Sequence, residues 1–186
     1  MLNHVGTKEI ETDRLLLRPF RVGDAGEMYQ NWASDEEVTK FLTWPTHKDP
    51  ELTKRLMEDW VSKYEDSEYY HWAITLKSTG DVMGSFGLMN IDNHNESCEA
   101  GYCIGKKWWN QGLMTEALQA VTRFAFTEVG FIRFAARHDI HNVASGCVMK
   151  KCGMQYEGTL RKVLKNSKGI LADCRVYSIL KEEGHQ

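Results

Sequence analysis

The chain has 186 residues, of which 42% are hydrophobic and 26% are charged, so it has the length and apolar content of one folded domain. Its 3 prolines and 15 glycines exclude a collagen-like or low-complexity protein. No apolar run approaches the roughly 20 residues that cross a bilayer, so we expect no membrane partner. The 5 cysteines are an odd number and widely spaced, which predicts a cytoplasmic protein with free thiols.

The net charge of −3 conceals an asymmetry along the chain. Residues 1–100 hold ten Lys and Arg against nineteen Asp and Glu, whereas residues 101–186 hold thirteen against seven. This asymmetry has two interpretations. The charges lie wherever residues are exposed and have no functional meaning, or the first half favours a cationic ligand and the second half an anionic one. A nucleic-acid binder requires a concentrated basic face and a positive total, so nucleic acid is not expected as a direct partner.

The N-terminal part of the chain predicts one strand followed by helices. The strand is expected at 15–20, where apolar residues are concentrated. Asp24 with Glu27 matches the capping box that opens a helix, and Ser34 with Glu37 matches a second one.

Asp49 caps a third predicted helix, in which Pro50 takes a first-turn position that needs no amide partner. The apolar period then changes to that of strands, which are predicted at 71–76, 82–90 and 99–104. The remaining predicted elements are a helix at 114–129 ended by Gly130, a strand at 132–137, a helix from the cap Asn142 to Gly153, and a hairpin of 154–164 and 171–180. Together these elements predict a single mixed α/β domain.

The stretch 99–117, EAGYCIGKKWWNQGLMTEA, is the most informative part of the sequence. A strand leads through a glycine turn directly into a helix, whose first-turn amides lack intrahelical acceptors. Gly112 permits a close approach of the backbone, so the stretch predicts an anion site suited to a diphosphate. Gly101 and Gly105 are separated by three residues rather than the four of a P-loop, and no G-x-G-x-x-G follows a strand.

Four segments in this order resemble the GCN5-related N-acetyltransferases (GNAT superfamily), and within it the RimJ/RimL-like branch that acetylates ribosomal-protein N-termini. They are TDRLLLR at 12–18, the stretch 99–117, NVAS at 142–145, and GM at 153–154 with EG at 157–158. The match spans about residues 10–182. It implies a central, mostly antiparallel sheet with flanking helices, in which two parallel strands, 99–104 and 132–137, splay apart.

The resemblance implies that acetyl-CoA lies between these two strands as the cosubstrate. The first strand is expected to bind the pantetheine arm, the loop and helix amides the diphosphate, and the next helix the arm and the nucleotide phosphates. The residues implied are Tyr102, Cys103, Ile104, Gln111, Gly112, Leu113, Met114, Thr115, Asn142, and Lys150 or Lys151. Two positions depart from the family's pattern, because Trp109 replaces a Gln or Arg, and Met114 replaces a small residue and is expected to narrow the loop.

An amine attacks a thioester only when unprotonated, and the pKa of a lysine side chain is about 10.4 whereas that of an α-amine is nearer 8. A general base that acts through a water therefore helps the reaction. Glu99, on the strand that leads into the loop, is the predicted base, and Glu96 is the alternative. By the resemblance Ser145 is the proton or hydrogen-bond donor to the departing thiolate, with Tyr156 as a more distant alternative.

The cysteines do not have the spacing of a metal site. Cys98 and Cys103 are expected on opposite faces of a strand, and Cys147 and Cys152 lie about 140° apart around a helix. No C-x-x-C is present, so no metal is predicted. Cys147 is expected to face the core.

Two histidines and two tryptophans complete the candidate residues. His138 and His141 fall where a strand becomes a loop, so both are expected to be solvated. Trp32 and Trp44 belong to the helical first part, which by the resemblance walls the acceptor side, and are the predicted substrate-binding residues.

The sequence therefore predicts an N-acetyltransferase that moves the acetyl group of acetyl-CoA directly to a primary amine, with a protein N-terminus as one acceptor. The alternatives are a small-molecule amine acetyltransferase, for a polyamine, antibiotic or amino acid, and a non-catalytic CoA-binding regulatory module. Family members often pair through the sheet or the C-terminal hairpin, so a homodimer is one assembly open to the chain.

Overall fold

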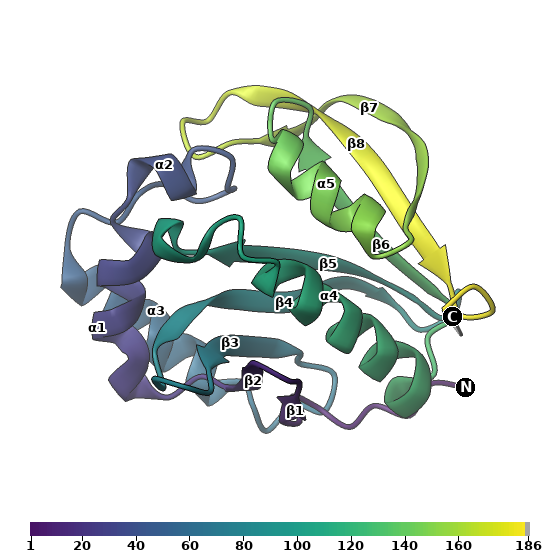
Figure 1. The fold of residues 1–186 in the computed structure, drawn as a ribbon, viewed down its shortest axis with the longest axis horizontal. Helices are drawn as coiled ribbons and strands as arrows, with labels where there is room; N and C mark the ends of the chain where they lie inside the picture. The colour runs from purple at the N-terminus through teal and green to yellow at the C-terminus, as the bar shows by residue number, and fades with distance from the viewer. Residues whose placement is uncertain (185–186) are drawn as a thin grey trace.

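In the computed structural model, which describes residues 1–184, eight strands form one sheet in the order β1-β2-β3-β4-β5-β6-β8-β7 (Figure 1). The strands are β1 (Ile10–Glu11), β2 (Leu15–Pro19), β3 (His71–Leu76), β4 (Val82–Asp92), β5 (Ser97–Ile104), β6 (Arg133–Asp139), β7 (Gln155–Lys165) and β8 (Leu171–Leu180). All neighbours pair antiparallel except β5 and β6, which run parallel. The predicted mixed, mostly antiparallel sheet is confirmed.

The two parallel strands separate after a short paired stretch. Residues 97–100 of β5 pair with 133–136 of β6, and no pairing follows on the described chain between the last four residues of β5 and the end of β6. Beyond this point β5 still pairs with β4, and β6 with β8. The sheet therefore opens between β5 and β6 at the end where β5 runs into the glycine loop.

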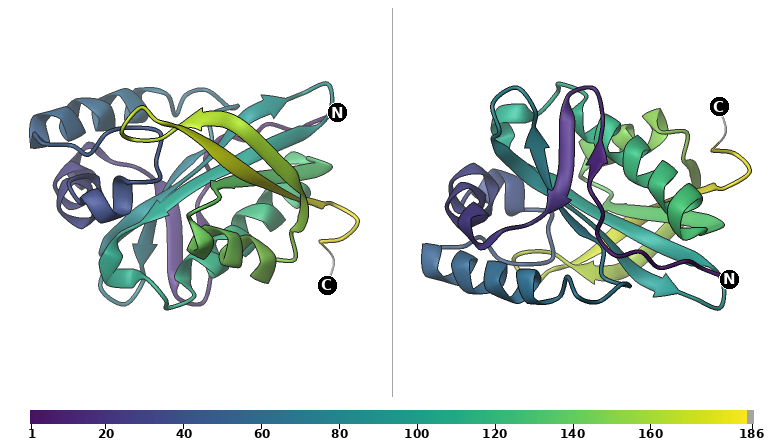
Figure 2. Two further views of the ribbon diagram at one scale, coloured as in Figure 1. Left: turned by 90° about the horizontal axis from the view of Figure 1, so that it is seen from above. Right: turned by 90° about the horizontal axis from the view of Figure 1, so that it is seen from below.

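The helices cover both faces of the sheet (Figure 2). They are α1 (Ala25–Met28), α2 (Glu36–Thr39), α3 (Pro50–Ser62), α4 (Leu113–Phe124) and α5 (Val143–Lys151). Helices α4 and α5 lie over one face, and α1, α2 and α3 lie over the other. No helix in residues 1–184 is long and apolar enough to span a membrane.

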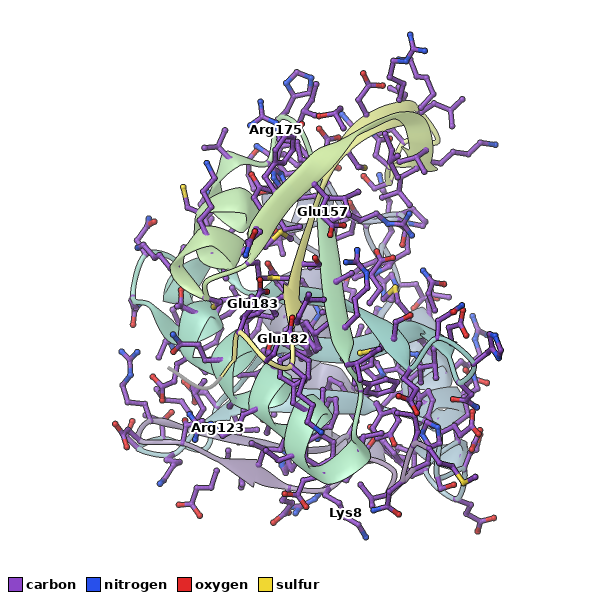
Figure 3. The ribbon with its side chains drawn as sticks, turned by 90° about the vertical axis from the view of Figure 1, so that its right-hand side faces the viewer. Lys8, Arg123, Glu157, Arg175, Glu182 and Glu183 are labelled. Atoms are coloured by element: carbon purple, nitrogen blue, oxygen red, sulfur yellow. The ribbon has the colours of Figure 1, made fainter. Side chains whose placement is uncertain are left out.

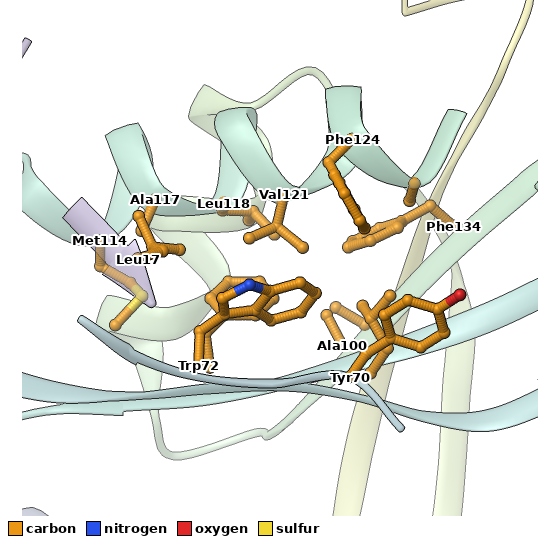
Figure 4. Packing of buried hydrophobic residues seen from close by; sticks show 14 of the residues in the cluster. Leu17, Tyr70, Trp72, Ala100, Met114, Ala117, Leu118, Val121, Phe124 and Phe134 are labelled. Carbon is orange, nitrogen blue, oxygen red and sulfur yellow. The ribbon is translucent and has the colours of Figure 1, made fainter. Parts of the chain in front are cut away.

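Each face has its own apolar core. Under α4, the fully buried Trp72 and Phe86 pack against Leu118 and Val121 (Figure 4). On the other face a second cluster forms around Met28, Trp32 and Met57. Burial of each such large side chain contributes about 1.5–3 kcal/mol, so the two cores fix the helices on the sheet from both sides.

The caps at the first two helices differ from the prediction. The Asp24 carboxylate accepts hydrogen bonds from the Arg18 guanidinium at 2.7 and 2.9 Å and from the Arg21 N–H, so it forms no capping box with Glu27. Glu27 instead accepts the N–H of Val82 at the start of β4, at 2.8 Å. A buried arginine outcompetes the local cap because a charged, bidentate pair is stronger than one neutral hydrogen bond.

The cap of α2 lies one residue later than predicted. Asp35, not Ser34, accepts the Glu37 N–H, and the Ser34 hydroxyl donates to the Tyr29 carbonyl, which ends a π-helical turn at Tyr29–Ala33. The caps predicted at Asp49 and Asn142 are confirmed.

Two further predictions about solvent contact are wrong. His138 is buried within β6, where its ring stacks on Tyr177 and its Nε2 lies so close to Gly146 that a Cβ there would clash at 2.7 Å. Cys147 is exposed rather than facing the core, because α5 turns Gly146 and Met149 toward the sheet instead.

Candidate active site

The backbone of β5 offers hydrogen-bonding groups to the opening between β5 and β6. The Gly105 N–H donates to the Met83 carbonyl of β4 at 2.8 Å. Since backbone groups in an antiparallel pair alternate between the two sides, Cys103 also pairs toward β4. Tyr102 and Ile104 therefore direct their backbone groups toward the opening. The expectation that Cys103 offers its backbone there is wrong, because its groups belong to the ladder with β4.

The glycine loop that follows β5 has two residues in the left-handed region. Asn110 has φ of 60° and Gly112 has φ of 75°, and α4 begins at Leu113 directly afterwards. Trp109, at the position where the family has Gln or Arg, donates its indole N–H to the Ile104 carbonyl at 2.8 Å. Trp109 thereby ties the loop back to the end of β5, which is why the departure from the family's pattern leaves the turn intact.

Met114 does not narrow this loop. Its side chain is only 7% exposed and packs beside Leu17 in the core under α4 (Figure 4). The first-turn N–H groups of α4, at Leu113, Met114 and Thr115, have no intrahelical acceptors and carry the positive end of the helix dipole. The expected obstruction is absent because the helix turns position 114 toward the sheet.

The N-terminus of α5 lies beside the opening and carries Ser145. Its amide is capped by the Asn142 side-chain oxygen at 3.3 Å, and its hydroxyl oxygen lies 3.2 Å from the Tyr102 hydroxyl. The Tyr102 ring stacks on Phe86 with the ring centroids 5.4 Å apart. Burial raises the pKa of Tyr102, so its hydroxyl stays protonated, and either hydroxyl of the pair can donate to the other.

Glu99 lies on the opposite face of β5 from the Tyr102 side chain, with its side chain 18% exposed. Its carboxylate forms an ion pair with the Nε of Arg137 on β6 at 2.7 Å and accepts from the Asn90 side chain at 3.1 Å. Glu96, the alternative base, pairs with the amino terminus of the chain at 2.8 Å, at the closed end of the β5–β6 pair. The structure therefore favours the position of Glu99 over that of Glu96.

The sequence did not predict that Arg137 and Asn90 contact the Glu99 carboxylate. Arg137 shares a face of β6 with Arg133 and alternates with the buried Phe134 and Ala136, so its direction was readable from the strand pattern. The pairing of Arg137 with Glu99 could not be predicted from the sequence, because the two residues are 38 positions apart and meet only across the parallel strands β5 and β6.

The two tryptophans predicted to bind the acceptor differ in position. Trp32 has no exposed surface and packs in the second core, so the prediction that it lines the acceptor side is wrong. The π-helical turn that carries it directs position 32 toward the sheet. Trp44 is half-buried in the loop after α2 and packs against the His47 ring in a tilted arrangement, with the ring centroids 5.1 Å apart.

The hairpin of β7 and β8 extends the sheet beyond β6, with which β8 pairs (Figure 3). Arg133 pairs with Glu157, whose carboxylate also accepts the Ser178 hydroxyl at 2.7 Å. The hydrogen bond from Arg133 is the main cause that lowers the pKa of Glu157 to about 2. The tip of the hairpin, at Ser167 and Lys168, reaches the segment that follows α2 and encloses a cavity of 290 Å³ with it.

Lys150 and Lys151 lie exposed in the last turn of α5, and Cys98 and Cys103 lie on opposite faces of β5, as predicted. Within the described part of the chain, no three His, Cys, Asp or Glu side chains form a group that could hold a metal ion. The strand opening, the loop amides and the Tyr102–Ser145 pair fit an extended thioester cosubstrate that carries phosphates.

The model of the acetyltransferase (GNAT) domain family matches residues 14–155. The chain is 31% identical over 172 residues to the uncharacterized N-acetyltransferase p20 of Bacillus licheniformis, with 92% of this chain and 96% of that protein covered. It is 24% identical over 170 residues to the ribosomal protein uS5-alanine N-acetyltransferase of Escherichia coli (strain K12), with 87% of this chain and 86% of that protein covered.

Among solved structures, a GNAT-family acetyltransferase from Bacillus anthracis matches with a TM-score of 0.81 and 25% identity, over 95% of this chain and 100% of that one. The resemblance seen in the sequence is confirmed by these matches. The chain belongs to the GNAT family and is an acetyl-CoA-dependent N-acetyltransferase.

Proposed function

We propose that the enzyme transfers the acetyl group directly to a primary amine and that the α-amine of a protein N-terminus is its acceptor. The observation that carries the direct transfer is the strand opening, with Glu99 on one face of β5 and the Tyr102–Ser145 pair on the other. The acceptor is supported by the substrate named for the Escherichia coli relative and by the acidic first half of the chain.

The chain's own residues are proposed to hold acetyl-CoA, which supplies an activated thioester. The Tyr102 backbone and the Ile104 N–H contact the pantetheine arm, and Asn142 contacts it from α5. The N–H groups of residues 111–115 contact the diphosphate, and Lys150 contacts the nucleotide phosphates. Apart from Lys150, which lies in the last turn of α5, each of these groups faces the opening or lies at a helix N-terminus beside it.

Glu99 is proposed to accept the amine proton through a water, from a position fixed by Arg137 and Asn90. At about pH 7.5, roughly a quarter of an α-amine is unprotonated, whereas only about one lysine side chain in a thousand is. An α-amine therefore needs little help from Glu99. A carboxylate held in place by Arg137 and Asn90 is a sufficient base for such an acceptor.

Ser145 is proposed to donate a hydrogen bond to the sulfur as the carbon–sulfur bond breaks. In this proposal the Tyr102 hydroxyl is the donor of its 3.2 Å hydrogen bond to Ser145, which leaves the Ser145 proton free and polarises the Ser145 hydroxyl toward the sulfur. The pair stabilises the developing negative charge. Glu99 passes the proton of the amine to solvent and the thiolate takes one from solvent, so the overall reaction neither gains nor loses a proton.

The acceptor is tested by measuring CoA release with a series that lengthens from an amino acid amide to a hexapeptide amide. We expect kcat/KM to rise as residues are added beyond the first, because the residues after a protein N-terminus add contacts that a single amino acid lacks. Higher kcat/KM for a polyamine or a free amino acid would assign a small-molecule acceptor instead. Binding of acetyl-CoA without CoA release across the panel would indicate a CoA-binding module.

A further inference from the structure

The turn between β1 and β2 reaches across to the first turn of α4 and surrounds the carboxylate of Glu116. The Thr12 hydroxyl and the Arg14 N–H donate to Oε1 at 2.6 and 2.9 Å. The Arg14 guanidinium donates to Oε2 through Nε at 2.7 Å, and its Nη2 lies 2.7 Å from the same oxygen as an ion-pair contact. Three hydrogen bonds and one ion-pair contact from two residues therefore converge on the Glu116 carboxylate, which is more than a simple surface ion pair provides.

Arg14 also contacts the glycine loop directly. Its Nη1 donates to the Gln111 carbonyl at 3.0 Å. In a trans peptide the C=O and the following N–H point in opposite directions, so this contact turns the Gly112 N–H away from Arg14. Gly112 itself adopts φ of 75°. A residue held in a sparsely populated conformation persists only where its surroundings fix it, and Arg14 provides one such contact.

The same contacts control the charge at this end of α4. Glu116 lies in the helix turn whose amides face the loop, where a lone carboxylate would repel an anion. Burial alone would raise the pKa of Glu116, but the hydrogen bonds from Thr12 and Arg14 bring the net pKa below its usual value. The carboxylate is thus ionised, and the guanidinium beside it cancels its charge.

We propose that Arg14 is a positioning residue for the diphosphate of acetyl-CoA. It orients the Gln111–Gly112 peptide toward the ligand and offsets the negative charge of Glu116, without belonging to the reacting groups. This gives a function to the TDRLLLR segment at 12–18, which the acetyl-transfer mechanism leaves unexplained. The inference rests on the proposed placement of the diphosphate at this loop.

The test compares the binding of CoA with that of pantetheine, which lacks the diphosphate and the nucleotide, by calorimetry. For Arg14→Gln we expect the Kd of CoA to rise about fivefold to tenfold, the size of one lost charged hydrogen bond at a half-exposed site, while the Kd of pantetheine stays the same. Arg14→Lys should recover only part of the loss, because an ammonium cannot contact Glu116 and the Gln111 carbonyl as a planar fork does.

Lys77→Gln is the matched control. Lys77, in the turn that follows β3, lies beside the β1–β2 turn, where it pairs with Glu11 at 2.5 Å and donates to the Thr12 carbonyl. Among the described residues it has no hydrogen bond to α4 or to the glycine loop. It should leave both dissociation constants unchanged.

An unchanged Kd for CoA in Arg14→Gln, or an equal loss for CoA and pantetheine, would overturn the proposal. The first outcome would show that Arg14 does not contribute to diphosphate binding, and the second would indicate a general loss of structure. Because binding needs no acceptor, a wrong acceptor or a failed acetyl transfer would appear in the CoA-release assay and not in these constants.

Discussion

The Tyr102–Ser145 contact leads to a prediction about turnover. Tyr102→Phe removes one hydroxyl and keeps the ring that stacks on Phe86, so the fold should be unaffected. The hydroxyl makes one neutral hydrogen bond of 3.2 Å, and such a bond contributes about 1 kcal/mol. We therefore expect kcat to fall about fivefold with no change in the KM for acetyl-CoA. Ser145→Ala removes the proposed donor to the sulfur and should lower kcat by about 30-fold, or about 2 kcal/mol.

The decisive measurement is the double variant, assayed by CoA release at a saturating acceptor concentration. Since Tyr102 acts only through the Ser145 hydroxyl, Tyr102→Phe should have no further effect in the Ser145→Ala background. Two effects that multiply independently would refute this reasoning, as would a rise in KM in place of the fall in kcat, because the contact would then serve binding alone.

Three other predictions concern the base, the buried ion pair and the thiols. Glu99→Gln should lower turnover about 100-fold for a lysine-like amine and about tenfold for an α-amine, and equal losses across an acceptor series of rising pKa would remove Glu99 from the role. Arg18→Met leaves Asp24 buried without its partner and should lower the free energy of unfolding by about 3–5 kcal/mol in urea denaturation, whereas a loss under about 1 kcal/mol would show that the pair is dispensable. In the native state iodoacetamide should modify the exposed Cys147 well before Cys98, whose pKa burial raises, and peptide mapping by mass spectrometry that found the reverse order would contradict the burial of Cys98.

Local chemistry made much of the fold predictable. The alternation of apolar residues located the strands, and the helix caps at Asp49 and Asn142 follow from side chains that bind amides two or three residues away. Gly130, with φ of 96°, ends the helical segment that continues α4, as expected of a residue that adopts the left-handed conformation without cost. The sequence also placed the glycine loop, because a strand, Gly112 and a helix start are adjacent along the chain.

Where a side chain had two possible partners, the sequence predicted the local one and the distant one prevailed. Asp24 was expected to cap a helix, but the buried Arg18 occupies its carboxylate. Trp32 was expected to line the acceptor side, but the π-helical turn directs it into the second core. Met114 was expected to narrow the loop, but its side chain packs in the core between α4 and the sheet instead.

The sequence by itself determined the mixed fold, the family and the place of the glycine loop, because each depends on neighbours along the chain or on short motifs. Only the tertiary structure decided which groups face one another at the site, namely Glu99 with Arg137, Tyr102 with Ser145, and Arg14 with Glu116. The members of these pairs are 38 to 102 positions apart. They meet because the parallel pair opens and because helices from distant segments dock on it, and no periodicity within a single element carries that information.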